Sequence, residues 1–420
     1  MKQSKFFHFF HGPALGNALF VYAAYSFRFV SPLLLYPLLT RRLGTEAFGV
    51  YAAAYSMALM LSVVIEFGFT LSGTRDIALA RTSETRAQIA SKVIIAKIIL
   101  LPVAALIGAV LISTNPTLNS YMLASAIAIA IGCAQGLSTL WYFQGTQRLK
   151  TAFFVEVLGQ ISALIAIVAL VSSSADLETA LGIQAAGFAL NFALGATLMF
   201  RECPFQRTRI SDALKVIRQS SLLFLVRASN VIFTTASVFI LAGLSNPYQA
   251  ALYGASERIT GAFAALLNPL SALFMPKLVP IADADPRRGL KLALRLLTVV
   301  VLIYAVFAAA IFVTAPNLTA LAFGSNFSAA SSVLQILAIT LPIISANTVI
   351  NIQILIPLRK DRVMMFVMAA AGAANILIAI ILTPIHGAIG MAVARLAIEA
   401  FILIFYTIYL VINNRKTKKL

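Results

Sequence analysis

The chain has 420 residues, of which 60% are hydrophobic and only 11% are charged, and its mean hydropathy is +0.93. Soluble domains carry about 25% charged residues, so the composition excludes a soluble enzyme and indicates a protein that crosses the membrane many times. The net charge of +18 does not indicate a nucleic-acid partner, because Lys and Arg beside membrane spans collect on the cytoplasmic side.

Apolar windows recur along the whole chain, each near the roughly 20 residues that a helix needs to cross a hydrocarbon layer of about 30 Å. We count twelve, at approximately 14–39, 47–69, 93–113, 119–140, 152–173, 179–200, 219–243, 249–273, 296–315, 330–356, 363–383 and 386–411. With a cytoplasmic amino terminus, 25 of the 32 Lys and Arg residues fall on the inner side. We therefore predict a multi-pass membrane protein with both termini in the cytoplasm.

The first span carries Arg28 with about ten apolar or small residues on either side. Its length argues against a cleaved signal peptide, whose apolar region has about 7 to 15 residues. Asn17, Tyr25 and Ser31 share one helix side with Arg28, since positions three, four, seven or eleven apart lie together. Such a polar side is typical of a helix that faces a water-filled cavity or a partner helix rather than lipid.

The second and third spans each place one charge toward the inner membrane surface. Glu66 lies at the inner end of the second span, and we expect it either to pair with a neighbouring helix or to carry a proton or sodium ion. Lys97 lies in the third span without an acidic partner on its own helix. Two interpretations of Lys97 stay open: its ammonium group snorkels to the surface within an ion pair, or it binds substrate.

The chain is internally repeated at an offset of roughly 200 residues. The motif "GVYAAA" at 49–54 follows Arg28, and "ALYGAS" at 251–256 follows Arg227 in the same way. Two sets of six spans make a parallel repeat about an axis along the membrane normal. We predict an all-α fold of twelve transmembrane helices in two six-helix lobes related by a pseudo-two-fold axis. The amino-terminal lobe, the cytoplasmic connector and the carboxyl-terminal lobe are expected at 1–200, 201–218 and 219–420.

The connector leads directly into the seventh span. It places Ile210, Leu214 and Ile217 on one face, which is typical of a short helix lying in the membrane interface. In the seventh span, Arg227 and Asn230 share a polar side that matches the polar side of the first span. We therefore expect the arginines of the two repeats to line one positively charged cavity between the lobes.

The eighth and twelfth spans carry charges of opposite sign close together. Glu257 is adjacent to Arg258, and Arg395 precedes Glu399 by one helical turn. Because an Arg or Lys at the bilayer centre costs roughly 2.5 to 3.5 kcal/mol, these cations need compensation. Either packed ion pairs hold the helices in register, or hydrated guanidinium groups bind a phosphate or carboxylate of the substrate.

Five prolines lie inside the predicted spans, where each removes a backbone hydrogen bond and can bend its helix. They are Pro32, Pro37, Pro102, Pro269 and Pro342. We consider them candidate hinges for the rocking of one lobe against the other, and static kinks are the alternative.

A series of segments spread along the chain carries a further signal. They are "YPLLTRRLGTEAFGVYAAAYS" (36–56), "EFGFTLSGTRDIALAR" (66–81), "WYFQGTQRLK" (141–150), "LTALAFGSNFSAASSVLQILAITLPI" (318–343) and "HGAIGMAVARLAIEA" (386–400). In order and spacing, this series resembles bacterial polysaccharide transporters of the O-antigen flippase type. The resemblance implies a two-lobed inner-membrane transporter of the multidrug, oligosaccharidyl-lipid and polysaccharide exporter superfamily. The chain departs from relatives at Gln147, where they often carry an acidic residue.

The resemblance also implies a function. Such proteins look like flippases that carry an undecaprenyl-pyrophosphate-linked oligosaccharide from the cytoplasmic to the periplasmic leaflet by alternating access. The expected substrate-binding residues are Arg28, Arg227, Arg258, Lys97, Arg395 and Asn230. The alternative is an ion-coupled exporter of another substrate, either a peptidoglycan lipid precursor or a drug. An enzyme such as a polymerase or ligase should have large periplasmic loops, and every predicted outer loop is short.

The expected cofactors and partners follow from this assignment. We expect no catalytic residues, no metal and no cofactor, and we consider H+ or Na+ coupling at Glu66, Glu257 or Glu399. The expected partners are the lipid-linked oligosaccharide and membrane lipids, with other polysaccharide-assembly proteins as a further class and no nucleic acid. Cys133 and Cys203 are too few for a disulfide framework.

Overall fold

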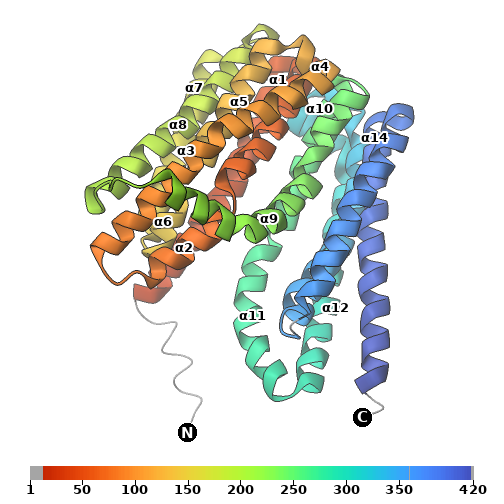
Figure 1. Ribbon diagram of the computed structural model, residues 1–420. Helices are drawn as coiled ribbons and strands as arrows, with labels where there is room; N and C mark the ends of the chain where they lie inside the picture. Colours follow the sequence, from red (N-terminus) through yellow and green to blue (C-terminus); the bar gives the residue numbers. More distant parts are fainter. Residues whose placement is uncertain (1–12, 359, 418–420) are drawn as a thin grey trace. The chain divides into compact units, whose positions relative to one another are not determined.

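The computed structural model describes residues 13–358 and 360–417, and most of them are helical (Figure 1). The chain divides into two compact units that are built from interleaved segments. The first unit lies within Met1–Leu35, Met57–Ser113 and Met122–Ala228, and the second lies within Tyr36–Ser56, Thr114–Tyr121 and Ser229–Leu420. The first helix therefore contributes to both units. The lobe boundaries expected from the sequence stay a prediction.

The first unit is a bundle of apolar helices. It contains parts of α1 (Pro13–Glu66) and α9 (Ile210–Leu244), together with α2 (Phe69–Leu79), α3 (Ser83–Thr114), α5 (Met122–Gly136), α6 (Leu140–Gly145), α7 (Leu149–Leu170), the 3-10 turn η2 (Ser174–Asp176) and α8 (Leu177–Glu202). Helices α5 and α7 pack on α8, and α2 packs on α6. Trp141, Tyr142 and Phe143 of α6 are buried among residues of α2, α3 and α8. These aromatic side chains fill the core of the unit.

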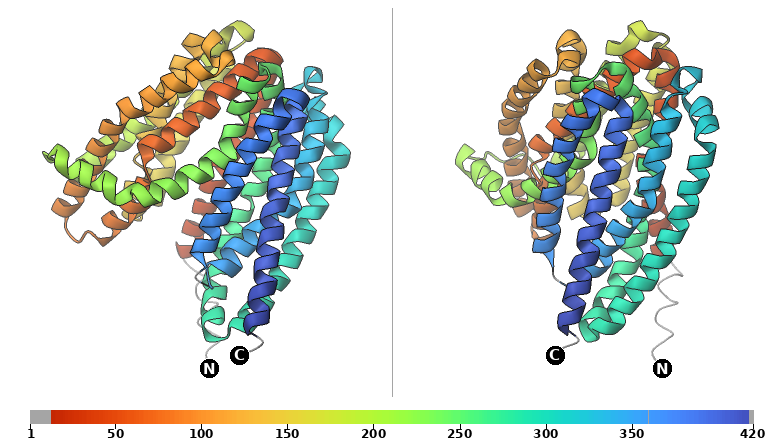
Figure 2. Two further views of the ribbon diagram at one scale, coloured as in Figure 1. Left: turned by 45° about the vertical axis from the view of Figure 1, so that its right-hand side comes forward. Right: turned by 90° about the vertical axis from the view of Figure 1, so that its right-hand side faces the viewer.

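The second unit contains the remaining parts of α1 and α9. Its other elements are α4 (Pro116–Ser120), α10 (Pro247–Ala265), α11 (Leu267–Ala284), α12 (Pro286–Phe323), the 3-10 turn η3 (Ser325–Phe327), α13 (Ala330–Val349), the π-helix η4 (Ile350–Leu355) and α14 (Asp361–Thr417). Helices α12, α13 and α14 run side by side (Figures 1 and 2). Ile354, Val367, Ile402 and Tyr406 belong to the core that η4 and α14 share.

Two very long helices are each divided by one glycine. In α1 the backbone leaves the helical conformation at Gly44 (φ 75°, ψ −179°), and in α14 it does so at Gly387 (φ 55°, ψ −132°). Glycine adopts such positive φ values without the steric penalty of a Cβ. Beside the second break, the Ala388 N–H donates to Gln249 Oε1 at 2.8 Å. Each long helix is thus a pair of helices that matches two of the predicted spans.

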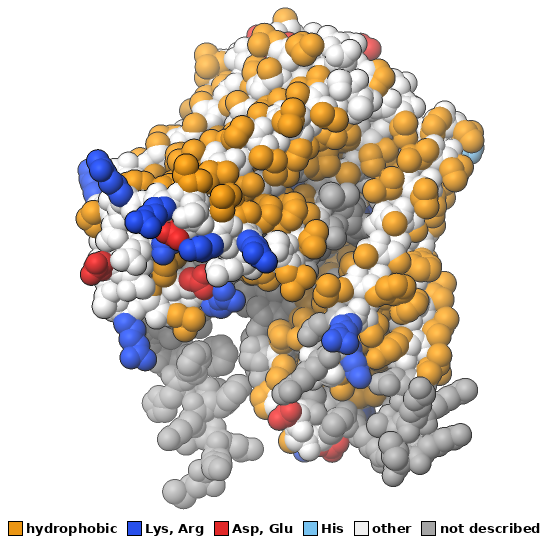
Figure 3. Space-filling model, in the orientation of Figure 1, with side chains coloured by type: hydrophobic (Ala, Val, Ile, Leu, Met, Phe, Trp, Pro, Cys, Tyr) orange, Lys and Arg blue, Asp and Glu red, His pale blue; other side chains and the backbone are white. Residues whose placement is uncertain are grey.

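The surface composition is that of a membrane protein. Within the described part of the chain, eight helices are long and apolar enough to cross a membrane. Large apolar side chains such as Leu106, Val306 and Val313 are exposed, and Figure 3 shows apolar side chains over much of the visible face. Lys and Arg side chains gather at one end of the first unit in the same view (Figure 3). The chain is therefore a multi-pass, all-helical membrane protein.

The predicted connector helix is the beginning of α9. The helix starts at Ile210 and continues to Leu244. Ala213 and Ser220 are buried in the first unit, whereas Ile210 and Leu214 of the predicted apolar face are exposed. The connector is therefore not a separate short helix, because nothing between Lys215 and the seventh span interrupts helical hydrogen bonding.

The predicted eighth span is divided between two helices. Helix α10 ends at Ala265 and α11 begins at Leu267. Proline lacks the N–H that would bond to the carbonyl four residues earlier, and for Pro269 that carbonyl belongs to Ala265. The predicted span over 249–273 therefore contains a helix break beside Pro269, one of the five prolines considered as candidate hinges.

Candidate functional site

Glu66 is the last residue of α1 and is held in place by the start of α2. Phe67 (φ 45°) and Gly68 (φ 78°) turn the chain sharply between the two helices. Oε1 of Glu66 accepts a hydrogen bond from the backbone N–H of Thr70 at 2.9 Å. A carboxylate at a helix amino terminus is stabilised by the unpaired N–H groups and by the helix dipole. The turn therefore fixes the position of the Glu66 carboxyl group within the first unit.

Arg227 of α9 is the ion-pair partner of Glu66. Its Nε donates to Glu66 Oε2 at 2.7 Å. The two side chains differ in exposure: the arginine is 41% exposed, and the glutamate is 12% exposed. The pair therefore joins an enclosed carboxylate to an arginine whose side chain is partly exposed.

Neighbouring contacts hold α9 against the turn that carries Glu66. The hydroxyl groups of Ser72 and Ser220 lie 2.9 Å apart. The rings of Phe67 and Phe224 are stacked, with their centroids 4.3 Å apart. A Cβ built on Gly68 would lie 2.9 Å from Leu223 Cβ, so only glycine allows this close approach. The sequence prediction that Glu66 reaches a neighbouring helix is confirmed.

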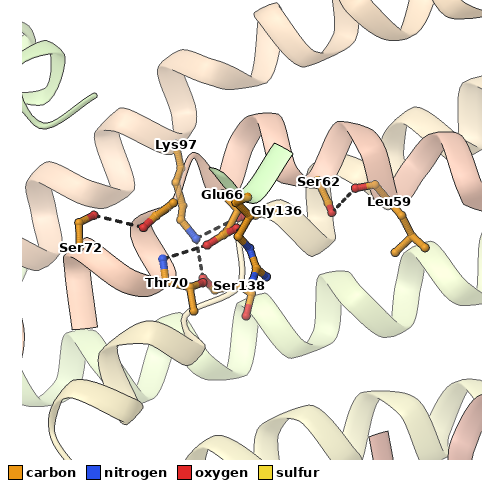
Figure 4. Close-up of polar contacts among 10 residues, drawn as sticks. Leu59, Ser62, Glu66, Thr70, Ser72, Lys97, Gly136 and Ser138 are labelled. Atoms are coloured by element: carbon orange, nitrogen blue, oxygen red, sulfur yellow. Dashed lines mark hydrogen bonds and ion pairs between the residues drawn. The ribbon is translucent and has the colours of Figure 1, made fainter. Parts of the chain in front are cut away.

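Lys97 of α3 is completely buried, with 0% of its surface exposed. Its Nζ donates to the carbonyl oxygens of Gly136 at 2.9 Å and Ser138 at 2.7 Å. Figure 4 shows Lys97, Glu66, Gly136 and Ser138 around one point of the first unit. Hydrogen bonds to a charged group contribute about 1.5 to 3 kcal/mol each, which is comparable to the cost of placing Lys in a membrane. The snorkelling interpretation was wrong, because the side chain is enclosed and its ammonium group binds backbone carbonyls.

Arg395 and Glu399 form the enclosed ion pair of the second unit. Nη2 of Arg395 lies 3.0 Å from Glu399 Oε1, and the side chains are only 14% and 5% exposed. Asn347 of α13 donates from Nδ2 to Glu399 Oε2 at 2.9 Å and to the Glu399 carbonyl at 3.0 Å. The predicted pairing one helical turn apart is confirmed, and Asn347 links neighbouring helices.

Arg258 of α10 binds a tyrosine. Its Nη2 donates to the Tyr36 hydroxyl at 2.6 Å, and its Cζ lies 4.4 Å from the Tyr36 ring centroid. Adjacent residues on a helix do not face each other, and the hydrogen bond of Arg258 goes to Tyr36 rather than to Glu257. The Glu257 carboxylate instead interacts electrostatically with Arg395 as well as with Arg258.

Two predicted substrate residues lie outside the part of the chain whose side chains are described. They are Arg28 and Asn230. Their backbones belong to α1 and α9, respectively. The prediction that Arg28 and Arg227 line one cavity stays a prediction.

The sequence of the chain matches known proteins over most of its length. A family model described as "Polysaccharide biosynthesis protein" matches residues 14–282. The chain belongs to this family. It is 24% identical over 399 residues to the "Putative O-antigen transporter" of Shigella dysenteriae, covering 93% of this chain and 98% of that protein. It is also 24% identical over 389 residues to the protein of the same name from Escherichia coli strain K12, covering 92% and 94%.

Solved structures share the fold of this polysaccharide biosynthesis protein. The lipid II flippase MurJ in an inward closed conformation aligns with a TM-score of 0.67 and 12% identity, covering 93% of this chain and 87% of that one. The eukaryotic MATE transporter AtDTX14 aligns with a TM-score of 0.51 and 12% identity, covering 93% and 94%. These likenesses show that the chain shares its fold with a lipid II flippase and a MATE transporter.

The sequence analysis did not identify several hydrogen-bonding partners of the charged side chains. Tyr36, Thr70, Gly136 and Ser138 each supply a partner to Arg258, Glu66 or Lys97. Three of these partners are backbone groups, which any residue type provides. A local signal existed only for Thr70, because it follows Glu66 by four positions and the intervening glycine indicates a turn.

Proposed function

We propose that this protein is a flippase for a lipid-linked oligosaccharide, an undecaprenyl-pyrophosphate-linked repeat unit of O-antigen or a related polysaccharide. It moves this substrate from the cytoplasmic to the periplasmic leaflet of the bacterial inner membrane. The family, the names of the relatives and the exporter-type fold support a transporter rather than an enzyme. Expected partners are the lipid-linked substrate, membrane lipids and other polysaccharide-assembly proteins.

We assign the chain twelve membrane helices in two lobes related by a pseudo-two-fold axis. A contact within the second unit supports this assignment. Tyr51 and Tyr253 occupy equivalent places in the two repeats, and both are completely buried. One position further along, a Cβ built on Gly254 would lie 3.5 Å from the Cβ of its equivalent, Ala52. Contact between equivalent residues is what a two-fold axis produces.

Arg227 is the observation on which the substrate assignment depends. A guanidinium group on an apolar helix is costly unless it is compensated, yet this one is 41% exposed and is held to Glu66 through Nε. Pyrophosphate offers charged oxygen atoms that a guanidinium fork binds in a bidentate manner. We assign Arg227 to the pyrophosphate, with Arg28 and Asn230 beside it in a cationic cavity between the lobes.

The other predicted residues receive different roles in this proposal. Arg258 joins helices of the second unit through Tyr36. Arg395 pairs with Glu399 on its own helix, and Glu399 in turn binds Asn347 of α13. Alternating access then occurs by rocking of the lobes around the cavity. A proton or sodium gradient drives transport through one of Glu66, Glu257 and Glu399.

The test is the identity of the lipid-linked intermediate that accumulates in cells lacking the gene. We expect the undecaprenyl-pyrophosphate repeat unit to accumulate on the inner leaflet and surface glycan to be lost. Arg227→Ala and Arg28→Ala should reproduce this phenotype at normal protein levels in the membrane. Lys215→Gln, in an exposed pair with Asp212, is the matched control and should restore glycan fully.

Two outcomes would contradict the proposal. Accumulation of a peptidoglycan precursor instead of the repeat unit would identify the alternative exporter. Normal surface glycan in both arginine variants would show that the guanidinium groups do not bind the substrate.

A further inference from the structure

Lys97 lies at a break in a membrane helix. Helix α5 ends at Gly136, and α6 begins only at Leu140. Between them, the Ser138 N–H bonds back to the Gln135 carbonyl, and Ser138 Oγ accepts from the Leu140 N–H at 3.3 Å. The last carbonyls of a helix have no partner within it, and that end carries a partial negative charge. The helix break near the end of this predicted span thus presents oxygen atoms that attract a cation.

The ammonium group of Lys97 occupies the position that these oxygen atoms favour. It donates to the carbonyls of Gly136 and Ser138, and it has no solvent exposure. Its other neighbour is the carboxylate of Glu66, with which it interacts electrostatically. In membrane transporters, unwound carbonyls and half-helix carboxyl ends coordinate sodium ions or protons. Here a side chain of the protein supplies the positive charge.

Glu66 therefore lies between two cations of different accessibility. Arg227 is 41% exposed, whereas Lys97 is enclosed. If Arg227 turns from Glu66 to another anion, the carboxylate keeps the hydrogen bond from the Thr70 N–H and the field of Lys97. The enclosed cation thus compensates the carboxylate independently of the exposed one.

We infer that the Lys97 ammonium group is the resident cation of a monovalent-cation site in the first unit. The Gly136 and Ser138 carbonyls form this site, and the Glu66 carboxylate is its electrostatic neighbour. A tethered cation leaves no place for a soluble coupling ion at Glu66. Ion coupling, if the proposed transport uses it, then depends on carboxylates of the second unit. The site itself does not depend on the proposed function, which is needed only for the release of Arg227.

The first test compares two truncations of Lys97 in the purified full-length protein. Lys97→Ala removes the ammonium group and leaves space beside the carbonyls, whereas Lys97→Met fills the space with an apolar chain of similar length. Thermal unfolding is measured in detergent with NaCl, ethylammonium chloride or choline chloride at equal ionic strength. We expect both variants to melt below the wild type. Sodium and ethylammonium should raise the midpoint of Lys97→Ala by at least about 2 °C more than that of Lys97→Met.

An equal response of Lys97→Ala and Lys97→Met to these cations would overturn the inference. Wild-type protein is the second control, because its site is already filled and its first unit should not respond. Glycan export does not enter this measurement. An equal response of the two Lys97 variants would therefore contradict the cation site but not the flippase proposal. Absence of the accumulated repeat unit would contradict the flippase proposal but not the cation site.

If Lys97→Ala does not fold, two milder variants test the inference: Lys97→Gln and the double variant Lys97→Gln/Glu66→Gln. The amide of Lys97→Gln retains N–H donors for the carbonyls but loses the charge. If Lys97 only capped a helix, this variant would melt like the wild type. We expect it to melt lower, and we expect the double variant Lys97→Gln/Glu66→Gln to recover at least half of the loss after correction for Glu66→Gln alone. No recovery in the double variant would overturn the inference.

Discussion

The two units of this protein enclose charge in different ways. In the first unit, the charged groups come from separate helices: Glu66 from α1, Lys97 from α3 and Arg227 from α9. In the second unit, Arg395 and Glu399 come from one helix, and Asn347 of α13 completes their hydrogen bonding. The arginines of the two ion pairs also differ in exposure, since Arg227 is 41% exposed and Arg395 is 14% exposed.

This difference separates an exchangeable ion pair from a structural one. Separation from Glu66 costs Arg227 less desolvation than a fully enclosed charge would pay, because 41% of its side chain is already exposed. Separating Arg395 from Glu399 costs more free energy, because both charges of that pair are enclosed. The first unit is therefore suited to receive an anion, and the second is suited to hold helices in register.

The largest expected effect is on the enclosed pair of the second unit. Arg395→Met should lower the free energy of unfolding by about 3 to 5 kcal/mol, because it leaves the Glu399 carboxylate buried without a counter-charge. The double variant Arg395→Met/Glu399→Gln should recover most of this loss. Denaturant titration followed by circular dichroism measures both. A loss below about 1 kcal/mol in the single variant would show that the pair is not structural.

The next largest effect is expected on glycan export in Arg227→Lys, which tests whether the ion pair of the first unit can exchange its anion. Arg227→Lys keeps the charge but loses the planar fork that binds phosphate oxygens at two points. We expect unfolding to stay unchanged and glycan export to fall about tenfold, equivalent to about 1.4 kcal/mol of binding. Surface glycan measured at matched protein levels tests this expectation. Export at the wild-type rate would show that Arg227 acts through its charge alone.

An effect of similar size, on stability rather than on export, is expected at Tyr36, the aromatic residue that binds Arg258 in the second unit. Tyr36→Phe removes the hydroxyl acceptor at 2.6 Å but keeps the ring beneath the guanidinium group. The loss should be about 1.5 kcal/mol, at the low end for a hydrogen bond to a charged group. Tyr36→Leu should cost about 0.5 to 2 kcal/mol more, because the cation–π contact is then lost too. Equal stability of Tyr36→Phe and Tyr36→Leu in the same titration would argue against the ring contact.

The sequence predicted local features of these sites and missed the distant ones. Arg395 and Glu399 could be paired from their spacing, because residues four apart on a helix are neighbours. Glu66 and Arg227 are 161 positions apart, and a single sequence contains no signal that joins them. The partners of Lys97 are backbone carbonyls, which no residue type reveals.

Helix breaks show the same limit of sequence reasoning. Pro269 indicated a real interruption, because the chain changes helix at Leu266. Pro102 and Pro342 lie inside α3 and α13, where surrounding helices compensate one missing hydrogen bond. The sharpest breaks are instead at Gly44 and Gly387. Glycine permits a break without requiring one, so the sequence could not locate them.

The smallest effect is expected at an ion pair that differs from Arg395–Glu399 mainly in exposure. Lys215 Nζ lies 3.0 Å from Asp212 Oδ1, three residues earlier on α9, and its side chain is 71% exposed. The hydrogen bond from Lys215 holds the pKa of Asp212 below its ordinary value, so any contribution to stability is present at neutral pH and lost as the pH falls through that lowered pKa. Water and salt screen an exposed pair, so Lys215→Gln should melt with the wild type at pH 7. A shift as large as that of Tyr36→Phe would mean that pairing itself stabilises this fold. Both pairs join neighbouring turns of one helix, and they differ mainly in burial. If Lys215→Gln melts with the wild type while Arg395→Met loses much stability, the loss in Arg395→Met is therefore due to burial of the pair.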